Sequence, residues 1–185
     1  MSQAPPPDVL SLFWSPVCAV GSHGAAGPNA QLCVSVFGAG VVPDRPRLLV
    51  NLWKDNRTAV LAGEAGTLAI TVLSAAQVHL VDVLGLKSGN DGPKLEGVAY
   101  ELTATGDPYF PGGAALLECE IIERLDLGDA WAFLVAVRER RRLSDAAPLS
   151  RQELMSLAGA DVRDRWAAKI AAAIPAYRIA MHWMD

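Results

Sequence analysis

Apolar residues along the chain form short runs separated by stretches that are rich in Gly, Pro and small polar residues. Runs of this length with partial two-residue alternation are typical of β-strands. They cover residues 17–20, 29–37, 48–53, 67–73, 98–103, 115–125 and 130–137. The last two runs are joined by Asp126-Leu127-Gly128-Asp129, a turn sequence that predicts a β-hairpin. Many short strands and few helices predict a mainly β fold, closed or partly closed as an antiparallel barrel.

The same pattern predicts short helices between some of the strands. Residues 59–62 read as a short apolar helix that should end at one of the two following glycines. Ser74 and Gln77 have the spacing of a capping box, so a further helix should begin there and stop at Gly85. Gly-rich stretches between the elements are predicted as loops, the second of them mobile. These stretches are residues 21–28 and 86–95.

The pattern changes to a helical period near the C-terminus. Ser150 and Glu153 form a second capping box, and Asp161 is the expected N-cap of a last helix, which Pro175 should end or kink. An apolar stripe on this helix repeats every four residues, at Val162, Trp166, Ile170 and Ile174. We therefore expect three parts: a flexible lead at residues 1–13, a barrel domain at 14–143, and a helical extension at 144–185. The extension should pack on the barrel or on a partner subunit.

Two stretches have the composition of a ligand site. The strand 48–53 gives way to the polar turn Lys54–Thr58, where two cations and small polar side chains precede a helix. The first N–H groups of a helix lack partners and carry positive partial charge, so a phosphate would be favoured there. On strand 29–37, one face carries small and partly polar residues, which suits a surface on which a flat ligand lies. These residues are Gln31, Cys33, Ser35 and Phe37.

Composition narrows the class of protein. The chain has 185 residues, 51% of them hydrophobic, which predicts one compact domain, and its net charge of −4 argues against a general nucleic-acid binder. No segment reaches the roughly 20 apolar residues of a membrane span, and the Pro-rich start lacks the pattern of a signal peptide, so a cytoplasmic protein is expected. Cys18, Cys33 and Cys119 are predicted to be buried thiols in a reducing compartment. The histidines show no ligand spacing, and no metal site is expected.

Three pieces of the sequence, in this order, resemble the flavin-reductase-like family. They are the strand opened by Asn29-Ala30, the segment 42–74 with its polar turn, and the segment 117–129 with its Gly-Asp turn. The resemblance covers about residues 14–143 and implies a split antiparallel β-barrel of the FMN-binding type with short helices and a helical C-terminus. It also implies a homodimer with one flavin in each barrel, near the subunit interface.

In this family the first polar strand faces the flavin ring and the polar turn binds the flavin phosphate. The resemblance therefore implies that the ring contacts Asn29, Ala30, Gln31, Leu32, Cys33, Val34 and Ser35. It assigns Lys54, Asn56, Arg57 and Thr58 to the phosphate, with Trp53 as a further cofactor-binding residue. FMN is the expected cofactor, FAD is the alternative, and NAD(P)H is the expected co-substrate. No residue is assigned a catalytic role.

The function that the resemblance implies is that of an FMN-dependent oxidoreductase in which hydride passes from NAD(P)H to flavin N5. A monooxygenase or another electron acceptor would then take up the electrons. Many members have a histidine after the Gly-Asp of the turn, whereas this chain has Ala130. His23 could replace it only if its Gly-rich loop folded over the site. Two alternatives therefore remain: a non-catalytic split barrel that binds flavin or haem, and a dimeric interaction scaffold whose C-terminal Trp166, Met181 and Trp183 contact another protein.

Overall fold

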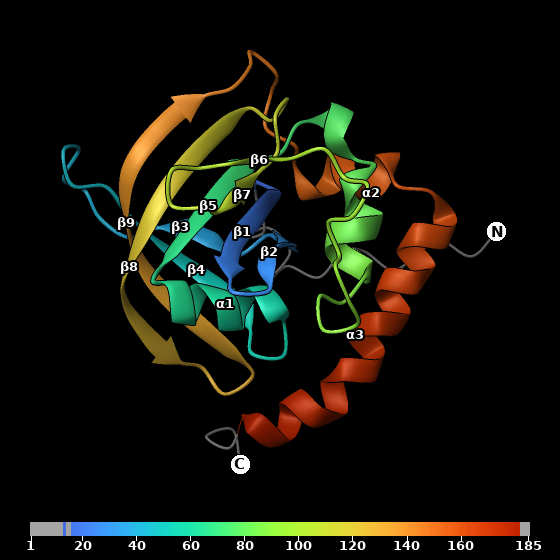
Figure 1. Cartoon of the computed structure of the whole chain (residues 1–185). Coiled ribbons are helices and arrows are strands. Elements are labelled where there is room, and N and C mark those ends of the chain that lie inside the picture. The colour runs from blue at the N-terminus through green and yellow to red at the C-terminus, as the bar shows by residue number, and fades with distance from the viewer. Residues whose placement is uncertain (1–12, 14–15, 182–185) are drawn as a thin grey trace.

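The fold is built on one curled antiparallel sheet of seven strands. The computed structural model describes residue 13 and residues 16–181. The strands lie in the order β2-β1-β5-β8-β9-β4-β3 (Figure 1). They are β1 (Cys18–Gly24), β2 (Gly27–Cys33), β3 (Val36–Gly38), β4 (Arg47–Trp53), β5 (Thr67–Val72), β8 (Ala115–Asp126) and β9 (Ala130–Arg142). A second, two-stranded sheet pairs β6 (Glu101–Leu102) with β7 (Pro108–Tyr109).

The two end strands of the sheet, β2 and β3, are consecutive segments of chain joined only by Val34 and Ser35. At the end of β2, Cys33 still pairs with Cys18 of β1. Immediately after the bend, the N–H of Asn51 in β4 donates to the carbonyl oxygen of Ser35 at 3.0 Å. One run of chain therefore joins both ends of the sheet, and the predicted mainly β split barrel is confirmed. The single strand predicted at 29–37 is in fact two strands, because it changes neighbours at this bend.

The helices are α1 (Arg57–Ala65), α2 (Arg151–Leu157) and α3 (Ala160–Ala180), with a 3₁₀ turn η2 (Ala75–Gln77) and a π-helical turn η3 (Asp82–Leu86). Gly66 ends α1 at φ 73° and donates its N–H to the carbonyl of Ala62 at 3.0 Å. Half of the predicted capping box at Ser150 is present: its hydroxyl accepts the N–H of Glu153 at 3.1 Å. Within the described residues, no helix is both long and apolar enough to cross a membrane.

One prediction about the last helix is wrong, and one of the two outcomes predicted for its proline is excluded. The N-cap of α3 is Gly159 and not Asp161, which lies within the first turn. Pro175 lies inside α3 and does not end it, although it cannot donate to the carbonyl of Ala171. Beyond the proline, the helix contacts the barrel: the rings of Tyr177 and Trp53 pack edge to face with 5.2 Å between their centroids.

Apolar side chains fill both sides of the first strand pair. One buried cluster lies inside the curled sheet and against α1, and it includes Cys18, Val20, Val50, Leu52, Leu68, Ile70, Phe133 and Val135. The other lies outside the barrel, toward α2, α3 and the turn η3, and it includes Val17, Ala19, Leu73, Leu80, Leu84, Phe110, Leu149 and Leu154. Because alternate residues of β1 serve the two clusters, the sheet separates two apolar layers. In Figure 1, α3 runs along the side of the second layer.

The Gly-rich stretch 21–28, predicted as a loop, is a tight hairpin: β1 continues to Gly24 and β2 begins at Gly27. Its glycines serve close packing. A Cβ on Gly21 would lie 2.1 Å from the carbonyl oxygen of Pro108 in β7. Strand β1 can therefore pass this close to β7 only at a residue without a side chain. The loop prediction failed because Gly21 lies within a strand, where the neighbouring backbone of β7 requires a glycine, whereas Gly27 serves the turn with a φ of 106°.

Replacing Gly21 with alanine should therefore destabilise the protein. The added methyl group forces β1 and β7 apart, and overpacking of this kind costs about 1–3 kcal/mol of unfolding free energy. Urea unfolding followed by circular dichroism measures the loss. Gly38→Ala is the matched control, because a Cβ at Gly38 in β3 would meet no atom within 4 Å. Equal stability of the two variants would contradict the close approach of β7.

Candidate functional site

A cavity of about 350 Å³ lies beside the bend between β2 and β3. The residues of the bend supply one wall, and η3 and α3 supply the opposite wall. Of the residues predicted to bind a cofactor, the cavity is lined by Gln31, Leu32, Cys33, Val34, Ser35, Trp53 and Asn56. Regular alternation would send these consecutive residues to opposite faces of a strand. The bend instead brings all five of its residues, 31–35, to the cavity.

Two buried amide oxygens on the cavity wall have no hydrogen-bond partner among the described residues. They are Oε1 of Gln31 and Oδ1 of Asn51. Leaving a buried polar atom unpaired costs about 1–3 kcal/mol, so such atoms are rare and mark places where a partner is expected. Both oxygens are acceptors. The cavity is therefore suited to a ligand that presents N–H or O–H donors toward the bend.

The Cys33 thiol is part of this wall, but its chemistry is that of a buried apolar group. Its Sγ donates weakly to the carbonyl of Asn51 at 3.5 Å. Burial raises the pKa of Cys33 to about 11, against a smaller opposing effect of a backbone hydrogen bond at Ser35. The thiolate, which is the nucleophilic form, is therefore scarce near neutral pH. Cys33 is therefore an apolar part of the cavity wall and not a nucleophile.

Positive charge reaches the cavity from elements that the sequence did not indicate as part of a site. Lys94 and Lys169 line it, together with Arg151 and Arg163. Lys94 is 9% exposed, and its Nζ donates to the carbonyl of Leu84 at 2.9 Å. Burial, and secondarily the charge of Lys169, lowers the pKa of Lys94 to about 8. The segment 86–95 was predicted as a mobile surface loop, yet Lys94 near its end is buried.

The polar turn Lys54–Thr58 reaches the cavity only in part. Asn56 lines it and precedes α1 without making a side-chain cap of its own. The Lys54 ammonium instead binds Asp126 and lies 4.6 Å above the ring of Trp131.

The other predicted contacts lie around the cavity without lining it. The Thr58 hydroxyl donates to Asn29 Oδ1 at 2.9 Å, and both residues are buried. Ala30 is packed in the outer apolar cluster. Arg57 is the first residue of α1, half-buried. Among the described residues, the predicted phosphate contacts Lys54, Arg57 and Thr58 are therefore not part of the cavity wall.

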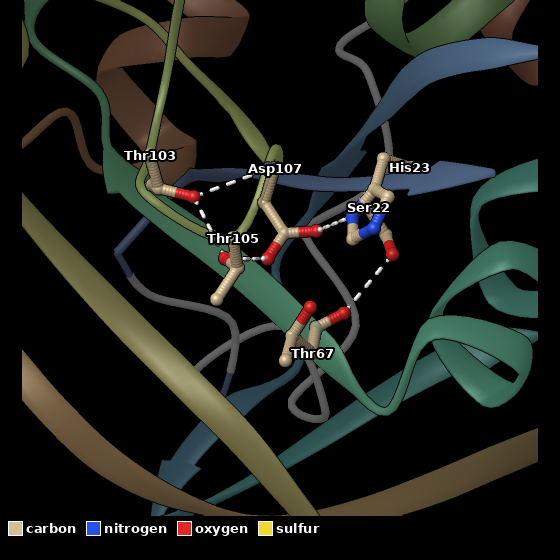
Figure 2. Close-up of polar contacts among 6 residues, drawn as sticks. All are labelled: Ser22, His23, Thr67, Thr103, Thr105 and Asp107. Atoms are coloured by element: carbon tan, nitrogen blue, oxygen red, sulfur yellow. Dashed lines mark hydrogen bonds and ion pairs between the residues drawn. The ribbon is translucent and has the colours of Figure 1, made fainter.

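His23 lies in strand β1 and not in a loop that could fold over the cavity. Figure 2 shows its ring against the buried carboxylate of Asp107, with 2.8 Å between Nδ1 and Oδ1. Thr105 donates to the other carboxylate oxygen at 2.7 Å, and its hydroxyl is 2.9 Å from that of Thr103. This network fixes the β6–β7 segment on β1. His23 is not among the residues that line the cavity.

Helix α3 contributes the part of the wall that the sequence analysis did not assign to a site. Trp166, Ala167 and Ile170 line the cavity, and Trp166 also packs on the outer apolar cluster. The four-residue spacing of Trp166 and Ile170 was visible in the sequence. It indicates a helix face that packs on something, but it does not indicate that a cavity lies beneath that face.

The sequence model of the flavin reductase like domain matches residues 10–154, which is most of the chain. The chain belongs to the flavin-reductase-like family. A flavin reductase of Pseudomonas putida is 28% identical over 142 residues, which are 76% of this chain and 81% of that protein. A high molecular weight rubredoxin of Moorella thermoacetica is 30% identical over 124 residues, 66% of this chain. Those residues are 53% of the rubredoxin, so the chain spans about half its length.

A solved structure supports the fold assignment. The NADH:FAD oxidoreductase of Streptomyces globisporus, in complex with NAD and FAD fragments, superposes with a TM-score of 0.66 at 25% sequence identity. The match covers 77% of this chain and 84% of that one. The family and the split-barrel fold predicted from the sequence are both confirmed.

The buried Lys94 should make stability depend on pH. Its pKa is about 8 in the folded protein and 10.5 ordinarily, so between these values the unfolded chain binds more protons than the folded one. Unfolding free energy should therefore rise with pH across this window, and Lys94→Met should abolish that contribution. Urea titrations at about pH 7 and about pH 10 give the change in unfolding free energy with pH for each protein. The contribution of Lys94 is the difference between wild type and variant in this change. The control is the exposed Lys87→Met, and an equal pH dependence in all three proteins would contradict the burial of the charge.

Proposed function

We propose that the cavity binds a flavin and that the protein is an oxidoreductase of the flavin-reductase type, with NAD(P)H as hydride donor. Membership of the family supports the proposal. The observation that carries it is the pair of unpaired amide oxygens, Gln31 Oε1 and Asn51 Oδ1, on the wall formed by the predicted ring-facing strand. A flavin ring is flat and apolar in the middle and has an imide N–H at one edge, a donor that either oxygen could accept.

The other walls fit the same ligand. Leu32, Val34 and Trp166 offer apolar surface to a flat ring. Lys94 offers a charge for the phosphate end, because its ammonium group reaches the cavity from beneath η3. The sequence analysis placed the phosphate at Lys54–Thr58; that site stays a prediction, to which Asn56 contributes the cavity-lining side chain.

A bound flavin supplies the redox chemistry at N5, and the protein has to bind, orient and shield it. Gln31 and Asn51 would hold the flavin by accepting two hydrogen bonds, one from the imide N–H of the ring and the other from a hydroxyl group of the ribityl chain. The apolar side chains around them exclude water from the buried face. Hydride transfer needs no general base, which is consistent with a cavity whose only thiol, among the described residues, is held protonated at Cys33.

A non-catalytic flavin-binding protein is the second candidate, and one observation favours it. Ala130 follows the Gly-Asp turn and is buried opposite Trp53 in the β4–β9 pair. Its methyl group offers nothing to hold a nicotinamide, where many relatives carry histidine. His23 does not compensate, because its ring is bound to Asp107 away from the cavity lining.

The proposal includes a homodimer and an external electron acceptor such as a monooxygenase. Apolar side chains that remain exposed in this chain support a partner subunit: Ile122 and Leu125 on β8 are 53% and 52% exposed, and Ile174 on α3 is 46% exposed. The extension 144–185 is proposed to pack partly on the barrel and partly on that partner. The three cysteines are free and buried, which suits the proposed cytoplasmic location.

The visible absorption spectrum of the purified protein tests the proposed activity. A flavin spectrum that bleaches on anaerobic addition of NADH or NADPH is the expected result. A flavin spectrum that persists with both donors would establish the non-catalytic alternative and overturn the reductase. Failure to bind any added flavin would overturn both.

Each of the two amide oxygens should lower the stability of the free protein and strengthen its binding of flavin. Gln31→Met or Asn51→Leu removes an unpaired buried acceptor, so each variant should gain about 1 kcal/mol of unfolding free energy. Each should also lose a hydrogen bond to the flavin, either from the ring imide or from a ribityl hydroxyl, which raises the Kd for riboflavin about tenfold. Urea unfolding and fluorescence quenching measure the two quantities.

Gln152→Met is the matched control for this pair of variants, because Gln152 is exposed on α2 and does not line the cavity. It should change neither quantity. Loss of stability together with loss of binding would show that the amides support the fold rather than the ligand.

A further inference from the structure

Two lysines from distant parts of the sequence meet on the carbonyl groups of η3. Lys94 Nζ donates to the carbonyl of Leu84 at 2.9 Å. Lys169, from the middle of α3, donates to the carbonyl of Gly85 at 2.8 Å and to that of Leu86 at 3.4 Å. Both ammonium groups are therefore held on one π-helical turn, a kind of turn that is frequent at functional sites. Each keeps N–H donors that these carbonyls do not use.

The positive charge at this point is balanced only in part, by the carboxylate of Asp91, which lies beyond ion-pair distance of Lys169. Among the described residues, no carboxylate lies within ion-pair distance of either ammonium group. Arg165 nearby is committed to Asp82 and Asp161. Burial lowers the pKa of Lys169, with Asp91 acting in the opposite direction. Adjacent like charges in a half-buried place are unfavourable unless an anion joins them.

The pair also stands between two hollows. Lys94 and Lys169 line the cavity beside the bend, and both also line a second, more open hollow of about 590 Å³. This second hollow lies against the segment 86–96, and most of the residues that line it are charged. Its other lining residues include Lys87, Ser88, Asp91, Glu96 and Arg165. A ligand long enough to occupy both hollows would pass between the two ammonium groups.

We propose that Lys169 and Lys94 together bind the diphosphate of a flavin dinucleotide, whose nucleoside end occupies the second hollow. The inference rests on the proposed function, since it takes the flavin ring to lie in the first cavity. Two ammonium groups at the junction match a linkage of two phosphates, each of which carries a negative charge. The protein is therefore selective for FAD over FMN.

The carboxylates that line the second hollow favour the binding of a nucleoside there over the binding of another phosphate. Asp91 and Glu96 can accept the hydroxyl groups of a ribose, as acidic residues do in other dinucleotide sites. The same carboxylates would repel a terminal phosphate placed beside them. Lys169 lies on α3, beyond residues 10–154 that the family model matches. The second lysine is thus a contribution of the C-terminal helix to a site that the family domain leaves incomplete.

Equilibrium titrations of the full-length protein with riboflavin, FMN and FAD test this inference. Riboflavin reports the ring cavity alone, FMN adds one phosphate, and FAD adds the diphosphate and the adenosine. Wild type should bind FAD about tenfold more tightly than FMN. Lys169→Met should raise the Kd for FAD about tenfold, raise that for FMN less, and leave that for riboflavin unchanged. Lys169→Arg keeps the charge and should keep the FAD preference.

Arg178→Met is the control, because it removes an exposed charge from α3 that lines neither hollow. It should alter none of the three constants. If wild type binds riboflavin but binds FAD and FMN equally well, the diphosphate site is overturned and the proposed function stands. Equal weakening of all three ligands by Lys169→Met would show a structural role for Lys169 and also overturn the inference. Absence of riboflavin binding to wild type would overturn the proposed function itself.

Discussion

The hydrogen bond from the Asn51 N–H to the Ser35 carbonyl, 3.0 Å long, is the constraint on which barrel and cavity both depend. It draws the chain away from β1 and onto β4 within two residues of Cys33. A strand that must serve two different neighbours cannot keep regular alternation, so consecutive side chains turn toward the same space. The closure of the sheet thus creates the cavity wall, and a change that straightened the bend would affect both together.

The second wall depends on weaker interactions. Helix α3 has no fully buried residue, and it is held by Trp166 on the outer cluster, by Arg165 on Asp82, and by Tyr177 against Trp53. A segment with so few buried contacts opens at lower free energy than the barrel strands. A ligand that touches both walls would stabilise the closed arrangement by mass action. Cofactor retention and the position of α3 are therefore coupled in this architecture.

The sequence predicted the strands, the long hairpin and the family, because these depend on local alternation and on short motifs. It also predicted that residues 29–35 face a ligand, and residues 31–35 of this set line the cavity. It could not place Lys94 or Lys169 at the cavity, since each is brought there by a long-range packing of η3 against α3 that no local pattern encodes. Gly21 was misread for the same reason: the neighbour that requires a glycine there, Pro108, is distant in sequence.

Polar groups buried in this protein are of two kinds, and the difference argues for function. Asp107 is 1% exposed, yet His23, Thr105 and the Thr103 hydroxyl satisfy its carboxylate and backbone, so the network is complete without a ligand. Around the cavity, two amide oxygens lack partners, and two ammonium groups lie together with no ion-paired carboxylate among the residues that the structure describes. Apolar replacements there would stabilise the free protein. Thr67 Oγ1 is also buried and unpaired but does not line the cavity, so a single unpaired atom does not indicate a ligand. The gathering of two unpaired amide oxygens and two ammonium groups around one cavity is what supports the proposed anionic ligand.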